Sequence, residues 1–173
     1  MLTLTLPRIT SLVSLGLLAA ACSDTTSTEA MDASAATEQT LIIDTHIDIP
    51  FRLHRGYVDV SKATDGGDFD YPRAKAGGLN AAFMSIYIPA AVDEAGDSVA
   101  LADKLIDDME NLASGHPDKF AIATCSADIT DQATRGVISM PLGMENGGPV
   151  ATSKEALDHF YQRGIRYITL SHS

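Results

Sequence analysis

The sequence predicts an α/β protein built from parallel βαβ units. Strand-like and helix-like segments alternate from about residue 41 onward, and this alternation is typical of a parallel sheet with crossover helices. The strand-like segments are apolar almost throughout, as expected of strands that are buried on both faces. An open doubly wound sheet and a (β/α) barrel both fit this pattern. No glycine-rich phosphate loop follows the first strand, so the nucleotide-binding version of the open sheet has no support.

Two N-terminal segments precede the predicted domain. Residues 1–21 carry one charged side chain, Arg8, followed by a short apolar run, which is the layout of a secretory signal peptide. The junction LLAAAC resembles a bacterial lipobox, in which Cys22 is lipidated and becomes the new N-terminus; a plain cleaved secretion signal is the alternative. Residues 23–40 are rich in Ser, Thr and Ala, and we expect a flexible linker. These features predict a lipid-anchored protein of the bacterial cell envelope, or otherwise a secreted one.

The predicted domain occupies residues 41–173, and its elements follow in order. Strands are expected at 41–48, 81–89, 120–125, 137–145 and 166–172. Helices are expected at 98–114, where apolar residues recur at amphipathic spacing, and at 153–164, where Ser153 caps the start and Gly164 ends the helix. Residues 49–80 read as a long loop that contains a short helix, and Cys125 is expected to be a buried strand thiol.

Three ionisable side chains interrupt the first strand at every second position. Asp44, His46 and Asp48 would therefore share one face, with His46 and Asp48 nearest the C-terminal end, where parallel α/β proteins build their sites. An imidazole and a carboxylate are suitable ligands for zinc. Asp44 lies deeper and would hold His46 through the second ring nitrogen. A chance H-x-D pair on the surface is the alternative.

The fourth and fifth strands add polar groups at the same rim. Glu145 ends an apolar run, beside Gly143 and the pair Gly147–Gly148, which let backbone or a metal approach closely. A buried carboxylate is costly unless a cation or hydrogen-bond donors satisfy it; a loop or helix-capping glutamate is the alternative. The fifth strand ends at His172. The sequence therefore predicts a metal site at this rim.

The charge balance argues against a nucleic-acid partner. The formal net charge is −11, and the chain offers no basic patch that would displace counterions from phosphates. We therefore expect no nucleic acid among its partners.

Four segments, in order, resemble the membrane dipeptidase (renal dipeptidase) family of zinc peptidases. They are DTHIDIPFRL, AGGLNAAFMSIYIP, GMENGG and GIRYITLSHS, and they run from about Leu41 to the last residue. One difference from the family pattern is Asn146, where the family often has glycine or another small residue.

The resemblance implies a fold, a reaction and residue roles. The fold would be the N-terminal part of a (β/α)₈ metallohydrolase barrel of the TIM type, with about five strands present. His46 and Asp48 would bind one zinc ion, Glu145 would bridge two, and His172 would contact the substrate carbonyl or the developing oxyanion. The reaction would be hydrolysis of dipeptides by a hydroxide shared between the two metals. The resemblance also implies a homodimer.

The family takes further groups from strands beyond the fifth, namely two histidines for the second zinc and an acidic proton-transfer residue. A complete barrel usually needs about 250 residues, so we expect an N-terminal portion of a longer enzyme, inactive by itself. Two alternatives are another amidohydrolase-type metallohydrolase, acting on a cyclic amide or ester, and a non-catalytic envelope lipoprotein that keeps the barrel scaffold. Amidohydrolases more often open with H-x-H than with H-x-D, which favours the dipeptidase.

Overall fold

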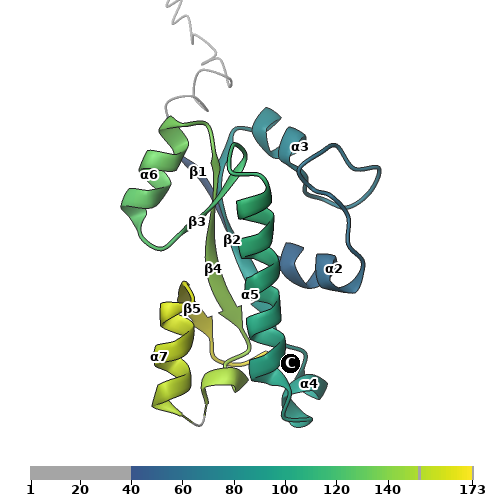
Figure 1. Cartoon of the computed structure of the whole chain (residues 1–173), viewed down its shortest axis with the longest axis vertical. Helices are drawn as coiled ribbons and strands as arrows, with labels where there is room; N and C mark the ends of the chain where they lie inside the picture. Colours follow the sequence, from purple (N-terminus) through teal and green to yellow (C-terminus); the bar gives the residue numbers. More distant parts are fainter. Residues whose placement is uncertain (1–39, 152, 173) are drawn as a thin grey trace, which may run out of the picture. The chain divides into compact units, whose positions relative to one another are not determined.

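The computed structural model describes residues 40–151 and 153–172 (Figure 1). These residues fall within one structural unit. The predicted signal peptide, the lipidation site Cys22 and all but the last residue of the predicted linker lie outside them. Within the described ranges, no helix is both long and apolar enough to cross a membrane.

Strands and helices alternate along the described chain, and every strand pair in it is parallel. The predicted α/β fold class is therefore confirmed. The strands are β1 (Ile42–Ile47), β2 (Leu79–Tyr87), β3 (Phe120–Ala123), β4 (Ile138–Glu145) and β5 (Ile165–Thr169). The helices are α2 (Ile49–Arg55), α3 (Tyr71–Ala76), α4 (Ala90–Glu94), α5 (Ser98–Gly115), α6 (Ser126–Thr134) and α7 (Lys154–Gln162), with a 3₁₀ helix, η1 (Gly148–Val150).

The sheet does not follow chain order. β1 pairs with β2 and β2 with β4, while β3 and β5 both pair with β4. β2 runs along β4 from Ser139 to Glu145, so β3 and β5 share the other hydrogen-bonding edge of β4. β3 takes the first half of that edge, up to Pro141, and β5 takes the second half, from Leu142. β3 is thus a short strand beside the start of β4, and the long strands run in the order β1, β2, β4, β5.

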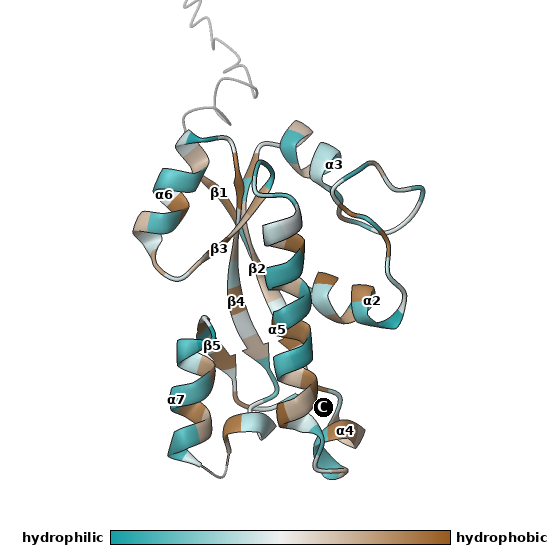
Figure 2. Ribbon diagram, in the orientation of Figure 1, coloured by the Kyte–Doolittle hydropathy of each residue, from teal (hydrophilic) through white to brown (hydrophobic). Residues whose placement is uncertain are grey.

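One face of this sheet forms the hydrophobic core with the helices. On β4 the core residues alternate along the strand, and helices α2, α5 and α7 contribute apolar side chains to the same cluster. Figure 2 shows the hydrophobic colour along the strands and in bands on α5. The fully buried members from β4 are Ile138, Met140, Leu142 and Met144. The intervening residues of β4 point to the opposite face, and this second face carries the polar groups described below.

β1 is more exposed than the sequence predicts. Ile43 on this strand is 41 % exposed, and the preceding Leu41 is 44 % exposed. β1 is bonded to β2 alone among the described strands, so it is an edge strand here. The prediction that the strands are buried on both faces is therefore confirmed for β4 and wrong for β1.

The connections contain more helix than the sequence predicts. Residues 49–80 hold two helices, α2 and α3, and α6 was not expected at all. These helices have six to nine residues, which is too short for a helical repeat of apolar residues to stand out. The cap of α7 is confirmed, because the Ser153 hydroxyl accepts a hydrogen bond from the Ala156 N–H.

Cys125 is not the buried strand thiol that the sequence predicts. It is exposed and stands at the N-cap of α6. The reason is that β3 ends two residues earlier, at Ala123, and the chain turns there into the helix.

Candidate metal centre

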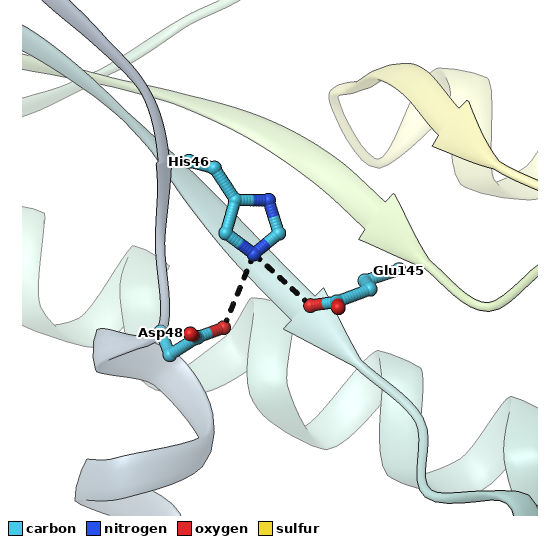
Figure 3. A group of neighbouring side chains, drawn as sticks. All are labelled: His46, Asp48 and Glu145. Carbon is cyan, nitrogen blue, oxygen red and sulfur yellow. Dashed lines mark ion pairs between the residues drawn. The ribbon is translucent and has the colours of Figure 1, made fainter. Parts of the chain in front are cut away.

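Three side chains from two distant segments of the sequence, His46 and Asp48 in one and Glu145 in the other, converge at the C-terminal rim of the sheet (Figure 3). Nε2 of His46 lies 3.3 Å from Oδ1 of Asp48 and 3.1 Å from Oε2 of Glu145. One candidate ligand atom from each residue lies within 4.8 Å of the other two. The structure therefore brings together the three residues that the sequence analysis selected as metal ligands.

His46 reaches this position through an irregularity in β1. Asp44 pairs with Ala82 and Ile47 with Met84, so β1 advances three residues while β2 advances two. An extra residue of this kind bends the strand and redirects the neighbouring side chains. The extra residue falls in the stretch that contains His46.

Asp48 lies beyond the strand and not on it. It is the N-cap residue of α2, with φ −88° and ψ 29°, and its side chain makes no capping hydrogen bond. The expected alternation of 44, 46 and 48 on one strand face is therefore wrong. His46 and Asp48 meet because the strand ends and the helix begins between them, and Asp48 keeps its carboxylate directed at the imidazole.

Glu145 is the least exposed member of the group, with 13 % of its side chain exposed. It is the last residue of β4, where it is in register with Tyr87 of β2. Its Oε2 also accepts a hydrogen bond of 2.7 Å from the hydroxyl of Ser85. Ser85 is not among the site residues that the sequence predicts. The signal that could have pointed to it is a serine in a largely apolar strand.

Asn146 follows Glu145 in a backbone conformation that few residues adopt. Its φ is +79°, a left-handed conformation that glycine adopts freely and asparagine tolerates best among the other residues. The side chain is also used, because its Nδ2 donates to Ile88 O and its Oδ1 accepts from Gly148 N. Asn146 thus supports the turn that follows Glu145.

The expectation that Asp44 holds the second ring nitrogen of His46 is wrong. Oδ1 of Asp44 instead accepts a hydrogen bond from the backbone N–H of His46, at 2.9 Å, a local contact typical of an Asp two residues upstream. The ring Nδ1 of His46 faces the hydroxyl of Tyr167, at 3.1 Å. Burial, together with the negative charges of Glu145, Asp48 and Asp44, raises the pKa of Tyr167. Its hydroxyl therefore keeps its proton at neutral pH.

His172 lies on the far side of Glu145 from His46. The sequence predicts that the fifth strand ends at His172, and this is wrong. In the structure β5 ends at Thr169, and His172 lies in the segment that follows it. Its Nε2 is 3.1 Å from Oε1 of Glu145, and its ring packs edge-on against Tyr87, with centroids 5.1 Å apart. The carboxylate of Glu145 is thus placed between two imidazoles, one on each oxygen.

An open hollow of about 280 Å³ adjoins these groups. It is lined by Asp48, Phe51, Tyr87, Glu145 and His172. The Phe51 and Tyr87 rings pack edge to face, 5.1 Å apart, and form an apolar wall beside the polar groups. A small polar molecule that enters this hollow meets the carboxylates and His172 together.

The donor set fits a divalent metal such as zinc. One imidazole nitrogen and two carboxylate oxygens are ligands that zinc accepts, and Nε2 of His46 faces both carboxylates. Two carboxylates at this separation repel one another unless a positive charge lies between them. Asp48 is 69 % exposed, which leaves a path from solvent to the group.

Fold and site together define a parallel α/β protein with a candidate metal centre at the C-terminal ends of its strands. The sequence matches the model of the membrane dipeptidase family (peptidase family M19) over residues 31–173. The chain belongs to this family. It is 31 % identical to dipeptidase ataJ of Aspergillus terreus over 144 residues, which cover 76 % of this chain and 35 % of that protein.

Solved structures show the same fold. Dipeptidase AC, a metallo peptidase of family M19, has a TM-score of 0.66 at 22 % identity, covering 74 % of this chain and 41 % of that one. A metallo peptidase from Rhodobacter sphaeroides, liganded with a phosphinate mimic of the dipeptide L-Ala-D-Ala, has a TM-score of 0.65 at 21 % identity, covering 74 % and 44 %. The chain spans about a third of the length of the curated relatives it matches.

Proposed function

We propose that the protein is a zinc-dependent dipeptidase whose first metal ligands are His46, Asp48 and Glu145. The observation that carries this proposal is the convergence of these three side chains within 4.8 Å, in a chain of the membrane dipeptidase family. A second zinc ion would share Glu145 and take its other ligands from outside the described residues.

Zinc in such a site would supply Lewis acidity and lower the pKa of a bound water. The protein supplies the arrangement around it. Glu145 offers both carboxylate oxygens, and Ser85 restricts their orientation by its hydrogen bond to Oε2. A ligand carboxylate that is held in this way loses less conformational freedom when it binds a metal.

His172 is the proposed contact for the substrate carbonyl. It lines the hollow together with Glu145, and an N–H donor at this place would stabilise negative charge on the carbonyl oxygen as the peptide bond is attacked. The rings of Phe51 and Tyr87 form an apolar wall on one side of the hollow, against which a small side chain of the substrate would pack.

We also propose that the protein is attached to the bacterial envelope through a lipid on Cys22. The lipobox-like junction before Cys22 supports this. The hydrolytic domain would then face the periplasm or the outer surface, where short peptides released from other peptides or from the cell wall would reach it. Lipidated or secreted, such a protein would act outside the cytoplasm.

The test is hydrolysis of a small panel of dipeptides by the full-length protein, which includes the part of the barrel beyond this chain, followed as released free amino acid. We expect turnover to stop when a chelator removes the metal and to return when zinc is added back. Glu145→Gln should lower turnover by more than about 100-fold, the upper limit typical of changes around a metal ligand. Glu94→Gln is the matched control, because Glu94 lies exposed on α4, and it should leave turnover unchanged.

The outcomes separate the alternatives. Chelator-insensitive turnover rules out the metal mechanism. A metal-dependent enzyme that ignores dipeptides but opens cyclic amides or esters is the amidohydrolase-type alternative. Zinc binding by the full-length protein without turnover of either class identifies the non-catalytic lipoprotein.

A further inference from the structure

Tyr167 and His46 touch although their strands are not neighbours. Tyr167 lies on β5 and His46 on β1, and strands β4 and β2 separate them in the sheet. Their side chains nevertheless meet, with the tyrosine hydroxyl 3.1 Å from Nδ1 of His46. The phenol ring must therefore extend across the polar face of the sheet.

Gly143 makes this crossing possible. Tyr167 is in register with Gly143 on β4, and Gly143 with Ser85 on β2, so the three residues form one row across the sheet. A Cβ atom at position 143 would overlap the ring of Tyr167. The ring also packs against Phe83 of β2, with centroids 5.3 Å apart. Gly143 lies beneath the Tyr167 ring and Phe83 lies beside it. Together they set the direction in which the Tyr167 hydroxyl points.

A second contact of the Tyr167 hydroxyl bears on the direction of this hydrogen bond. The hydroxyl lies 3.4 Å from the backbone carbonyl of Thr45, to which it can only donate, so a lone pair of the same oxygen is available to the imidazole. Nδ1 of His46 would then carry the proton and donate it. The other nitrogen, Nε2, is left with its lone pair toward Asp48 and Glu145, where a metal would be held.

We propose that Tyr167 is a positioning residue for the metal centre, which fixes both the tautomer and the ring orientation of His46. The proposal rests on the proposed function, since it assumes that His46 binds the metal through Nε2. Histidine ligands generally donate their second N–H to a carboxylate, a carbonyl or water. Here a neutral phenol takes that place, next to a site that already contains Asp44, Asp48 and Glu145. A neutral partner adds no further negative charge to this group.

The central test is metal affinity in the full chain, with Co²⁺ and Zn²⁺ as probes. Tyr167→Phe keeps the ring on Gly143 and removes only the hydroxyl. We expect an increase of about 10-fold in the dissociation constant, within the range found for partners of metal-bound histidines. The visible absorption of bound Co²⁺ should also change, because it reports ligand geometry. Tyr161→Phe is the matched control, since Tyr161 lies exposed on α7 and its change should leave both readouts as in the wild type.

A second variant tests the role of the glycine. Gly143→Ala should displace the ring and weaken metal binding when residue 167 is tyrosine. In the Tyr167→Phe background the same change should add little, because the hydroxyl through which it acts is already absent, and such non-additivity is the mark of coupled residues. Fully additive losses would overturn this part of the proposal. Unfolding of the metal-free variants, followed by circular dichroism, confirms that the compared proteins are folded.

The results distinguish the two proposals. If the wild type binds neither metal, the proposed function fails and the positioning role fails with it. If the wild type binds metal while Tyr167→Phe matches it within about twofold and shows the same Co²⁺ spectrum, the positioning role of Tyr167 alone is overturned.

Discussion

Ser85 and Glu145 are joined across neighbouring strands by a hydrogen bond of 2.7 Å, from the serine hydroxyl to Oε2 of the carboxylate. The same oxygen faces Nε2 of His46 at 3.1 Å. Ser85 is fully buried on β2, so its hydroxyl has a fixed direction. The orientation of the candidate ligand Glu145 thus depends on a residue that would bind no metal itself.

Removing the Ser85 hydroxyl should weaken metal binding without removing a ligand. We expect Ser85→Ala to raise the zinc dissociation constant by about 10-fold, because Glu145 loses the donor that orients it. Competition with a chromophoric chelator measures this directly. Ser114→Ala, at an exposed serine whose hydroxyl donates to Asn111 O near the end of α5, should show no change. Equal affinities for Ser85→Ala and wild type would contradict the expectation.

Asp48→Asn should separate metal binding from stability. Asp48 is well exposed and caps nothing, so the free energy of unfolding of the metal-free protein should change by no more than about 0.5 kcal/mol. Zinc affinity should fall by about 10- to 100-fold or more, because a charged ligand becomes a neutral one. Chemical denaturation and metal titration of one preparation measure both quantities.

Asp118→Asn is the comparison for Asp48→Asn, because Asp118 is exposed in the turn before β3. Asp118→Asn should alter neither the free energy of unfolding nor the zinc affinity. Loss of stability without loss of zinc affinity in Asp48→Asn would show that Asp48 has a structural role instead.

Asp70 should make the protein sensitive to acid. The backbone N–H of Arg73, with further donors from Thr64 and the Arg73 side chain, lowers the pKa of Asp70 to about 2. The pKa of Asp70 in the folded protein lies below its ordinary value of 3.8. The ionised carboxylate therefore stabilises the fold above pH 3.8, and this stabilisation is lost as the pH falls toward 2. Asp70→Asn can still cap α3 but cannot carry the charge. The difference in unfolding free energy between wild type and Asp70→Asn should therefore narrow as the pH is lowered.

A denaturant series at several pH values tests this dependence. Asp68→Asn, two residues away and exposed, should run parallel to the wild type at every pH. A difference for Asp70→Asn that stays constant down to pH 2 would show that the charge of Asp70 does not contribute.

Arg163 should stabilise the contact between α7 and α5. Its guanidinium contacts Asp103 and Asp107 at 2.6 Å each, and Glu110 at 3.3 Å. These carboxylates raise the pKa of Arg163 against the opposing effect of burial. Arg163→Met should lower the free energy of unfolding by about 1–2 kcal/mol, between the values typical of exposed and buried pairs, since it leaves three carboxylates without their common cation.

Arg135→Met is the control for Arg163→Met, because Arg135 makes a single exposed pair with Asp131. It should cost less than about 0.5 kcal/mol. Added salt should reduce the difference between the Arg163 variant and wild type, because it screens the pairs. A salt-independent difference would assign the effect to packing.

Cys22→Ser should release the protein from the membrane fraction. A thioether-linked lipid needs the sulfur of Cys22, whereas Cys125→Ser leaves that sulfur in place and is the matched control. Partition between detergent and aqueous phases in the producing bacterium measures the change. Detergent-phase partition that is unaffected by Cys22→Ser would overturn the lipid anchor and leave the plain secretion signal.

The positions of the long strands and of the candidate ligands follow from local features of the sequence. Apolar runs that end in His46, Asp48 or Glu145 indicate both a buried parallel strand and a polar group at its C-terminal end. The structure places all three at one rim. Local signals were sufficient here because all parallel strands present the same end to the same side of the sheet.

The sequence by itself thus determined the parallel α/β class, the approximate positions of the strands along the chain and the three residues that meet at the rim. The tertiary structure alone decided that β3 pairs beside the start of β4, that β1 contains an extra residue near His46, and that Tyr167, not Asp44, contacts the His46 ring. The physical reason is that strand register and side-chain contacts across several strands depend on pairing between residues far apart in the chain. The hydrophobic pattern of a strand indicates which of its faces is buried, but it does not indicate which other strand lies beside it.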